Sequence, residues 1–195
     1  LGPPDDIQEV KNAYDAYEKI LAYDPFSVND FLKAHELLTQ GLVGQSGRFR
    51  SKDVGIYNSQ GEVIHVGARP QFVSGLVTDL FKWAKTDETP LLIKSAVVHY
   101  EIEMIHPFED GNGRIGRLWQ SVLLSHWNSL FAWLPVETMV HDYQMQYYEK
   151  LRAADKANSS TVFIEFMLKM ILATIQKLHI PRIAQTESDK MSDKL

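Results

Sequence analysis

Apolar residues recur at helical spacing along most of this chain, in stretches separated by prolines and glycines. One stretch places Val10, Ala13, Tyr14, Tyr17 and Leu21 on a single face. Spacing of three and four residues is typical of an amphipathic helix, because it follows the 3.6-residue turn. Prolines restrict helices at fixed positions, so they divide the pattern into separate elements. The pattern therefore restricts the fold to a mostly α-helical one.

Seven helices are predicted from these breaks. They span about 5–23, 27–38, 71–85, 89–105, 113–125, 136–154 and 161–178. Asp5 or Asp6 is expected to cap the first helix and Ser27 the second, because their oxygens can accept hydrogen bonds from a first turn. Pro181 is expected to end the last helix.

A glycine-rich segment without helical spacing follows the second helix and predicts a β-hairpin. Two short apolar runs, 54–57 and 63–66, flank the turn sequence Asn58-Ser59-Gln60-Gly61. Such runs around turn residues are typical of paired strands. The chain is therefore predicted to form a helical bundle with one hairpin, as a single domain over 1–180 with a polar tail over 181–195.

Charge and composition exclude several classes of function. The formal net charge of −5 argues against a general nucleic-acid-binding protein, which usually carries a basic stripe. The absence of cysteine excludes thiol catalysis, disulfides and cysteine-ligated zinc, and it fits a cytoplasmic protein. The most apolar run, 163–175, contains Glu165 and Lys169, so no contact with a membrane is expected.

The segment 106–117 holds most of the chemistry in the sequence. It reads His-Pro-Phe-Glu-Asp-Gly-Asn-Gly-Arg-Ile-Gly-Arg. Pro107 disfavours helical geometry at the residue before it, so a helix should end at His106 and leave the imidazole facing a loop. Glycines in the following turn permit close approach of the backbone to a ligand. A new helix is expected from about Asn112 or Gly113.

A phosphate site is predicted at the start of this new helix. The first N–H groups of a helix lack partners within it and lie at the positive end of its dipole, which favours an anion. Arg114 and Arg117 share a face there, because they are three residues apart. Asp110 can hold Mg²⁺ against the same phosphates, and His106 can take a proton from a hydroxyl at neutral pH. Each feature alone is more often structural, but their combination favours a phosphate-handling site.

The segment resembles the motif of the Fic family, His-Pro-Phe-x-Asp/Glu-Gly-Asn-Gly-Arg-x-x-Arg, at every fixed position. Similarity extends over roughly 6–178 and includes 47–50, 54–56, 99–100, 147–151 and 163–168. The resemblance implies a Fic-type helical bundle with a β-hairpin flap, at about 54–66, beside an active-site loop at 106–117. It also implies a protein adenylyltransferase, which transfers AMP from ATP to a tyrosine, serine or threonine hydroxyl of a target protein and releases pyrophosphate.

By position in that motif, the resemblance assigns His106 as the catalytic base and Asp110 as the ligand of Mg²⁺ or Mn²⁺. Phe108 is implied to anchor the loop in the core. The residues implied to bind the phosphates of ATP are Gly111, Asn112, Gly113, Arg114 and Arg117.

Two further sets of residues follow from the resemblance. The flap is implied to pair its main chain with the target segment, through Val54, Gly55, Ile56, Tyr57, Ile64, His65 and Val66. The adenine pocket is implied to contain Tyr147, Tyr148, Leu151 and Asp155. Asp155 could accept a hydrogen bond from the exocyclic amine of the base. Tyrosine and leucine at this spacing are, however, more often core residues.

Many Fic proteins carry an inhibitory helix with the pattern Ser/Thr-x-x-x-Glu-Gly/Asn, whose glutamate pairs with the second motif arginine. The nearest match here is Thr161 to Glu165, inside a helix expected to be core. The inhibitory motif is therefore predicted to be absent and Arg117 to be unopposed, which predicts transfer activity. An inhibitory partner chain, a segment missing from the sequence and constitutive activity all remain open.

Two other functions remain open. The same loop can hold other donors, so transfer of UMP, phosphocholine or phosphate is an alternative to AMP transfer. A non-catalytic binding module with this fold is the second alternative, although the intact His106 and Asp110 argue against it. The sequence indicates neither the target protein nor the oligomeric state.

Overall fold

The computed structural model describes the backbone of residues 3–57 and 63–192. It describes the side chains of residues 3–55 and 65–177. These residues are predominantly helical, which confirms the predicted fold class. The elements are α1 (Pro4–Tyr17), α2 (Val28–Thr39), β1 (Gly55–Tyr57), β2 (Val63–Val66), α3 (Pro70–Thr86), α4 (Leu91–Ile105), α5 (Asn112–Trp127), the 3₁₀ helix η1 (Ser129–Ala132), α6 (Val136–Asp142), α7 (Gln144–Ala157) and α8 (Thr161–Ser192).

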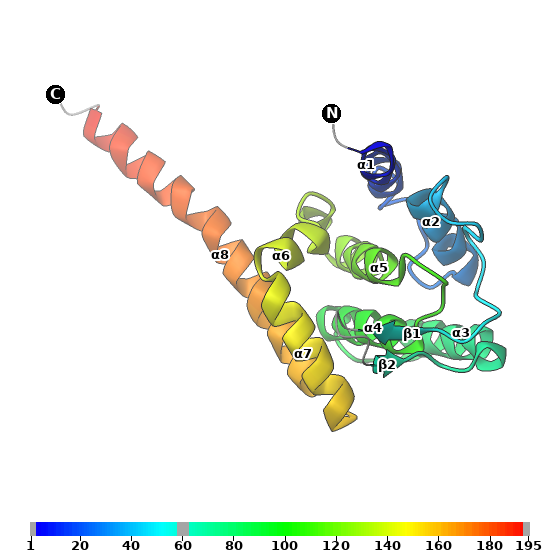
Figure 1. The fold of residues 1–195 in the computed structure, drawn as a ribbon. Coiled ribbons are helices and arrows are strands. Elements are labelled where there is room, and N and C mark those ends of the chain that lie inside the picture. The colour runs from blue at the N-terminus through cyan, green and yellow to red at the C-terminus, as the bar shows by residue number, and fades with distance from the viewer. Residues whose placement is uncertain (1–2, 58–62, 193–195) are drawn as a thin grey trace.

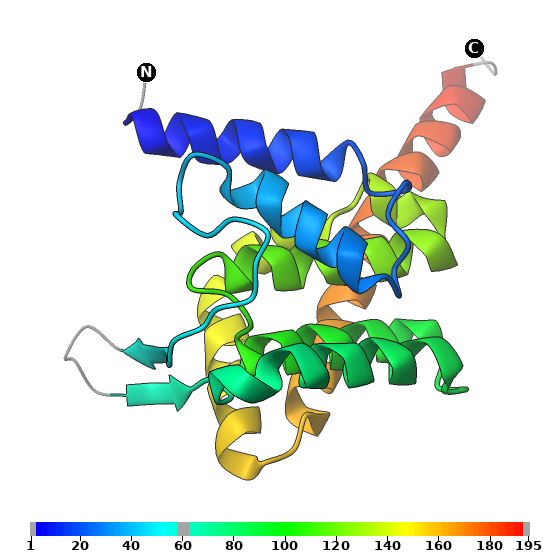
Figure 2. The same cartoon turned by 90° about the vertical axis from the view of Figure 1, so that its right-hand side faces the viewer.

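The α4 and α5 helices form the centre of the fold and pack on each other. In Figures 1 and 2, α1 and α2 lie over α5, whereas α3 lies beside α4 on the other side. The α7 and α8 helices pack together, and α8 also packs on α4. The motif loop joins the two central helices, so both of its ends are fixed in the core.

Two groups of buried apolar side chains hold these layers together. The first includes Phe31 and Trp119, whose rings meet edge to face at 5.1 Å, and the second includes Phe163. The α4 helix contributes Ile102 to the first group and Tyr100 to the second. The α4 helix therefore buries side chains on more than one side, which fits its central position.

The first helix is shorter than predicted and is not capped by an aspartate. It begins at Pro4, where the missing N–H costs nothing, so Asp5 and Asp6 lie inside the first turn. It ends at Tyr17, after which hydrogen bonds such as Lys19 N–H to the carbonyl of Ala16 form tighter turns. The prediction that Ser27 caps the second helix is confirmed, because its hydroxyl accepts the N–H of Asp30 at 3.2 Å.

The single helix predicted over 136–154 is two helices. Tyr143 leaves helical geometry, with φ −124° and ψ 27°, and separates α6 from α7. The break gives α6 an orientation of its own, so α6 packs against α5 while α7 runs along α8.

The last helix continues past Pro181, contrary to the predicted stop and polar tail. The backbone is helical through Ser192, and the far half of α8 projects from the body (Figure 1). Proline removes one backbone hydrogen bond and bends a helix, but the helix can resume beyond it. The domain boundary at 180 stays a prediction.

The strands β1 and β2 pair antiparallel, with Gly55 opposite Val66. The predicted turn at 58–61 lies outside the described residues. The Ala68 N–H donates to the carbonyl of Ile105 at 3.2 Å, which ties the base of this pair to the end of α4. The strands are therefore held beside the motif loop, and their role as a flap stays a prediction.

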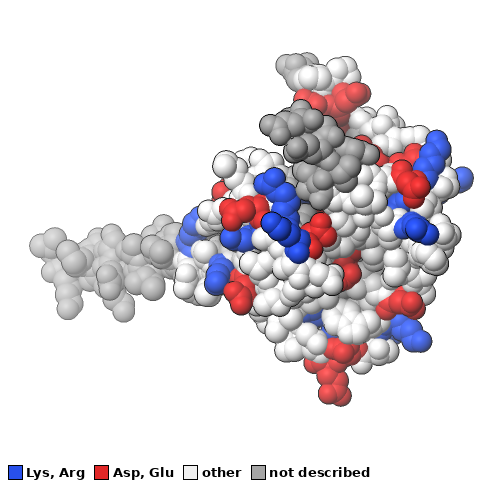
Figure 3. Space-filling view, turned by 60° about the horizontal axis from the view of Figure 1, so that its bottom comes forward, with Lys and Arg blue, Asp and Glu red and all other residues white. Residues whose placement is uncertain are grey.

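Acidic and basic side chains are interspersed on the face of the molecule seen in Figure 3. The coloured part of that face carries no continuous basic stripe. Among the described helices, none is both long and apolar enough to cross a bilayer.

Candidate active site

His106 lies at the junction of α4 and the motif loop. Its N–H still bonds the carbonyl of Ile102 at 2.9 Å, but its backbone is left-handed, with φ 52° and ψ 62°. The helix ends here as predicted, although residues before proline usually adopt an extended backbone instead. A non-glycine residue in the left-handed region is strained by about 1–2 kcal/mol, so the surrounding contacts must hold it.

The His106 imidazole is oriented by the main chain of Glu103. Its Nδ1 lies 3.3 Å from the Glu103 carbonyl oxygen, which can only accept a hydrogen bond, so Nδ1 carries the proton and Nε2 keeps a free lone pair. Burial lowers the pKa of His106 below the ordinary histidine value, although the nearby Glu103 carboxylate opposes this shift. The ring is therefore neutral at neutral pH, and Nε2 can accept a proton.

The loop after His106 is closed by the side chain of Asn112. This buried amide accepts the N–H of Phe108 and donates to the carbonyl of Phe108, both at 2.8 Å. Gly111 turns with φ 82°, and a Cβ there would meet Cγ2 of Thr39 at 2.8 Å, so only glycine fits. The α5 helix then begins at Asn112, and its first N–H groups have no partner within the helix.

Both motif arginines have carboxylate partners that the sequence did not indicate. Nη1 of Arg114 lies 3.1 Å from Oε1 of Glu9 in α1, and Nε of Arg117 lies 2.5 Å from Oε2 of Glu137 in α6. Burial lowers the pKa of Arg117, but Glu137 outweighs it and raises this pKa above the ordinary value. The prediction that Arg117 is unopposed is therefore wrong. No sequence pattern indicated this contact, because the break at Tyr143, which separates α6 from α7, was not predicted.

One pocket of about 480 Å³ brings together the predicted catalytic, metal-binding and phosphate-binding residues. Its walls are Glu9, His106, Glu109, Asp110, Gly111, Asn112, Gly113, Arg114, Arg117 and Tyr148. Glu137 does not line it. Nη1 of Arg117 lies 3.0 Å from the position of a Cβ on Gly113, so the guanidinium reaches the start of α5 while its Nε holds Glu137. The volume is in the range of small-molecule sites.

Asp110 is an exposed carboxylate at the rim of this pocket. Its Oδ1 accepts the N–H of Gly111 at 2.6 Å, and its Oδ2 lies 3.7 Å from Nη2 of Arg114. Within the described residues, no group of three or more His, Cys, Asp or Glu side chains comes together to hold a metal. Mg²⁺ keeps several waters and is often bound by one carboxylate together with substrate phosphates. Asp110 therefore fits a Mg²⁺ ion that arrives with a nucleotide.

His35 of α2 supports the motif loop from the core. Its ring stacks on Phe108 with centroids 3.6 Å apart, and Phe108 is fully buried, as predicted. Nδ1 of His35 accepts the Gly47 N–H at 3.0 Å, so Nε2 carries the proton and donates to the Asp110 carbonyl at 2.9 Å. Burial lowers the pKa of His35 to about 4. The ring is therefore a neutral bridge between α2 and the loop.

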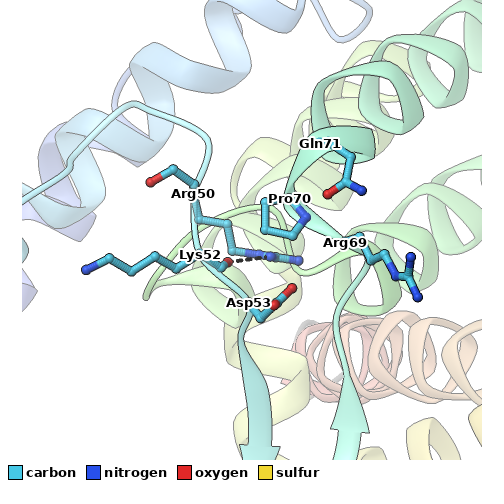
Figure 4. Close-up of a pocket in the computed structure, with 7 residues that line it drawn as sticks. Arg50, Lys52, Asp53, Arg69, Pro70 and Gln71 are labelled. Carbon is cyan, nitrogen blue, oxygen red and sulfur yellow. Dashed lines mark hydrogen bonds between the residues drawn. The ribbon is translucent and has the colours of Figure 1, made fainter.

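Arg50 fixes the other side of His106, at the base of the strand pair (Figure 4). Its Nε donates to the carbonyl of His106 at 2.6 Å, and its Nη2 donates to the carbonyls of Ile105, at 3.3 Å, and Ala68. Its Nη1 donates to the carbonyl of Lys52 at 2.7 Å. One buried guanidinium thus joins the end of α4, the strained histidine and the strand pair.

A second pocket, of about 380 Å³, adjoins the first at Tyr148. Its walls are His65, Glu103, Met104, Tyr148, Leu151, Arg152 and Asp155. Three of the four residues predicted for an adenine pocket therefore line one cavity. Tyr147 does not, because it is buried and its hydroxyl lies 3.0 Å from His99 and donates to Glu103 at 3.3 Å. His65 turns its ring toward Asp155, and its implied place in a target-binding flap stays a prediction.

Comparison with known proteins identifies the family. The model of the Fic/DOC family matches residues 25–124, which include α4, the loop and most of α5. The chain belongs to the Fic/DOC family. A crystal structure of a Fic family protein from Desulfovibrio desulfuricans G20 is 44% identical, with a TM-score of 0.86 over 91% of this chain and 55% of that one.

Two further similarities come from Caenorhabditis elegans. Its protein adenylyltransferase fic-1 is 29% identical over 160 residues, which is 80% of this chain and 29% of that protein. A structure of Fic-1 (aa134–508) shares the fold, with a TM-score of 0.72 at 23% identity over 95% of this chain and 54% of that one. The chain thus spans less than a third of the fic-1 protein and about half of the two structures.

The Fic motif gave no signal for Glu9, His35 or Glu137, which contact it from other helices. Sequence spacing reports neighbours within one helix, not contacts between helices that are distant in the chain. Arg50 lies in the stretch 47–50, which resembles Fic sequence, so its position was marked although its partners were not. Arg50 donates to four main-chain carbonyls, and because every residue has a carbonyl, the residue types do not reveal these partners.

Proposed function

We propose that this Fic domain transfers AMP from ATP to a tyrosine, serine or threonine hydroxyl of a target protein. The observation that carries the proposal is the convergence on one pocket of a neutral histidine with a free Nε2, an uncapped helix start and two arginines. This combination supplies a base for a hydroxyl and a positive surface for a polyphosphate.

In the proposed reaction, Nε2 of His106 removes the proton of the target hydroxyl while that oxygen attacks the α-phosphorus of ATP. The new bond joins the target oxygen to the α-phosphorus, and the bond from this phosphorus to the bridging oxygen of the β-phosphate breaks. Pyrophosphate leaves, and the proton passes from His106 to solvent. The lowered pKa of His106 favours this role, because the ring is already unprotonated at neutral pH.

The phosphates are proposed to lie against the start of α5. The main-chain N–H groups of Asn112 and Gly113 and the guanidiniums of Arg114 and Arg117 would bind the phosphate oxygens. Asp110 would hold Mg²⁺, which neutralises charge on the α- and β-phosphates. Glu9 and Arg114 both line the pocket, so a bound triphosphate would compete with the Glu9 carboxylate for the Arg114 guanidinium.

The adenine base is proposed to occupy the second pocket. Tyr148 lines both pockets, so a nucleotide with its phosphates in the first would extend its base into the second. Leu151 and Met104 supply apolar walls for a flat ring, and Asp155 supplies an acceptor for its exocyclic amine.

The strands β1 and β2 are proposed to hold the target segment by main-chain pairing. Arg50 ties their base to His106, so a segment added to this pair would lie beside the catalytic imidazole. Main-chain pairing positions a hydroxyl without requiring a particular neighbouring sequence. The names of curated relatives as protein adenylyltransferases also support the proposed activity.

The test is label transfer with Mg²⁺ to proteins of a host-cell lysate, with ATP labelled on the α- or the γ-phosphate. We expect labelled proteins only from the α-labelled donor, and label that forms about 10²–10⁴-fold more slowly with the His106→Ala variant. Label from the γ-phosphate alone would indicate phosphate transfer instead. Label from neither donor by a chain that binds ATP would contradict the proposal.

A further inference from the structure

His65 of β2 connects the strand pair to two walls of the proposed base pocket. Its Nε2 lies 2.8 Å from the carbonyl oxygen of Met104 at the end of α4. Its Nδ1 lies 3.1 Å from Oδ2 of Asp155 in α7. The His65 side chain is only 13% exposed, whereas that of Asp155 is 34% exposed. The imidazole is therefore an internal brace, and the carboxylate faces the cavity.

The two partners of His65 are both hydrogen-bond acceptors. A carbonyl and an ionised carboxylate only accept hydrogen bonds, so the ring can only donate to them. Its contacts reach Asp155 of α7 and the main chain of α4. This arrangement pins Oδ2 of Asp155. Among the described residues, no hydrogen bond reaches its other oxygen, Oδ1.

The cavity around this pair suits a flat ring with one polar edge. Met104, Leu151 and Tyr148 provide apolar and aromatic surface, while Asp155 lies among the polar groups of the wall. A carboxylate whose orientation is fixed selects for a donor at one position. It attracts an amino group, but it repels a keto oxygen, because both would be acceptors.

We propose that His65 is a positioning residue that orients Asp155 to accept a hydrogen bond from the 6-amino group of a purine. The pair thereby selects a 6-amino purine over a 6-keto purine. This inference rests on the proposed function, because it assumes that the base of a nucleotide enters this pocket. It adds a role for a strand residue that the motif does not include.

The test compares the binding of ATP and inosine triphosphate, which differ at the 6-position in amino against keto. Affinities are measured calorimetrically with Mg²⁺ in the His106→Ala background, so that transfer does not consume ATP. We expect ATP to bind at least about 10-fold tighter, the usual size of a hydrogen bond to a charged group. The His65→Gln substitution should bring the ratio toward one, mainly by weakening ATP.

Two further variants separate positioning from a general loss of structure. Asp155→Asn changes one atom and can donate to a keto oxygen, so it should narrow or reverse the ratio while thermal unfolding stays cooperative. His141→Gln is the matched control, because His141 also neighbours a carboxylate but is 86% exposed in α6. It should leave the ratio unchanged.

Equal affinity for the two nucleotides in the starting background would overturn the inference, as would an unchanged ratio in both His65→Gln and Asp155→Asn. In either case, α-phosphate transfer by the unmodified chain would leave the proposed function standing. If neither nucleotide bound at all, the proposed function and this inference would both fail.

Discussion

Glu137 lies against Arg117, with Oε2 of the carboxylate 2.5 Å from Nε of the guanidinium, and this ion pair joins α6 to the Fic motif. The Arg117 side chain is 12% exposed, so its charge would be largely buried without the partner. Because Glu137 stays outside the pocket that Arg117 lines, the pair can hold the guanidinium in place without covering the phosphate site.

We expect the Glu137→Ala substitution to lower the free energy of unfolding by about 1–3 kcal/mol, because it leaves a charged donor unsatisfied. It should also raise KM for ATP about 3- to 30-fold, since Arg117 is no longer held at the start of α5. Urea unfolding and ATP-dependent label transfer measure the two effects.

Glu149→Ala is the matched control, because Glu149 pairs with Lys150 at the surface of α7, and its loss should change neither quantity by much. Tighter ATP binding in Glu137→Ala would contradict the positioning role. It would mean that Glu137 competes with phosphate for Arg117.

The pH dependence of transfer should follow His106. Burial lowers the pKa of His106 below 6.5, and the base must be unprotonated to act. We therefore expect kcat/KM to be constant above about pH 7 and to fall only as the pH drops through the lowered pKa. The measurement is the initial rate of label transfer between pH 5 and 9.

His106→Ala should reduce the rate by about 10²–10⁴-fold and abolish the acidic limb of the profile. Asp110 is retained in this variant, so Mg²⁺-dependent ATP binding should survive. An acidic limb that persists in the variant would assign the titration to another group.

The stability of the fold should decrease in mild acid because of His35. Its folded-state pKa is about 4, whereas an unfolded histidine titrates near 6.5, so the unfolded chain binds more protons between these values. Stability therefore falls as the pH drops from about 6.5 to 4, by about 3 kcal/mol from this residue alone. Urea unfolding at pH 7.5, 5 and 4 measures the loss.

His35→Gln should flatten this dependence. An amide can accept the Gly47 N–H and donate to the Asp110 carbonyl, but it does not titrate. The exposed His141→Gln variant should keep the acid dependence of the unmodified chain. A His35→Gln chain that loses as much stability in acid would show that the effect arises elsewhere.

Arg50→Lys should impair catalysis more than ATP binding. A single ammonium cannot reach all four carbonyls that the guanidinium bonds, so the carbonyl of His106 loses its donor. We expect a stability loss of about 1–3 kcal/mol and a lower kcat, with the ATP affinity nearly unchanged.

Arg69→Lys offers the control, because Arg69 lines a surface pocket together with Arg50 but is itself exposed (Figure 4). It should alter neither stability nor kcat appreciably. A parallel loss of ATP affinity in Arg50→Lys would argue that Arg50 supports the phosphate site as well.

Helix positions followed from local patterns, but some helix ends did not. Ser27 caps α2, and α4 ends just before Pro107, as the chemistry of these two residues predicted. The last helix continued past Pro181 and a break formed at Tyr143, both against prediction, because a helix end also depends on packing against other elements. The hairpin strands were predicted in place and pair antiparallel, whereas their turn lies outside the described residues.

The sequence by itself determined the mostly helical fold, the family and the line of chemical groups from His106 to Arg117, because these follow from short-range spacing. Only the tertiary structure decided how those groups are held, with Glu137 on Arg117, Glu9 on Arg114 and His35 under the loop. It also decided that His65 lies against Asp155. Each of these contacts joins elements that are distant in the chain. Their formation depends on how the helices pack, and no local pattern in the sequence records that packing.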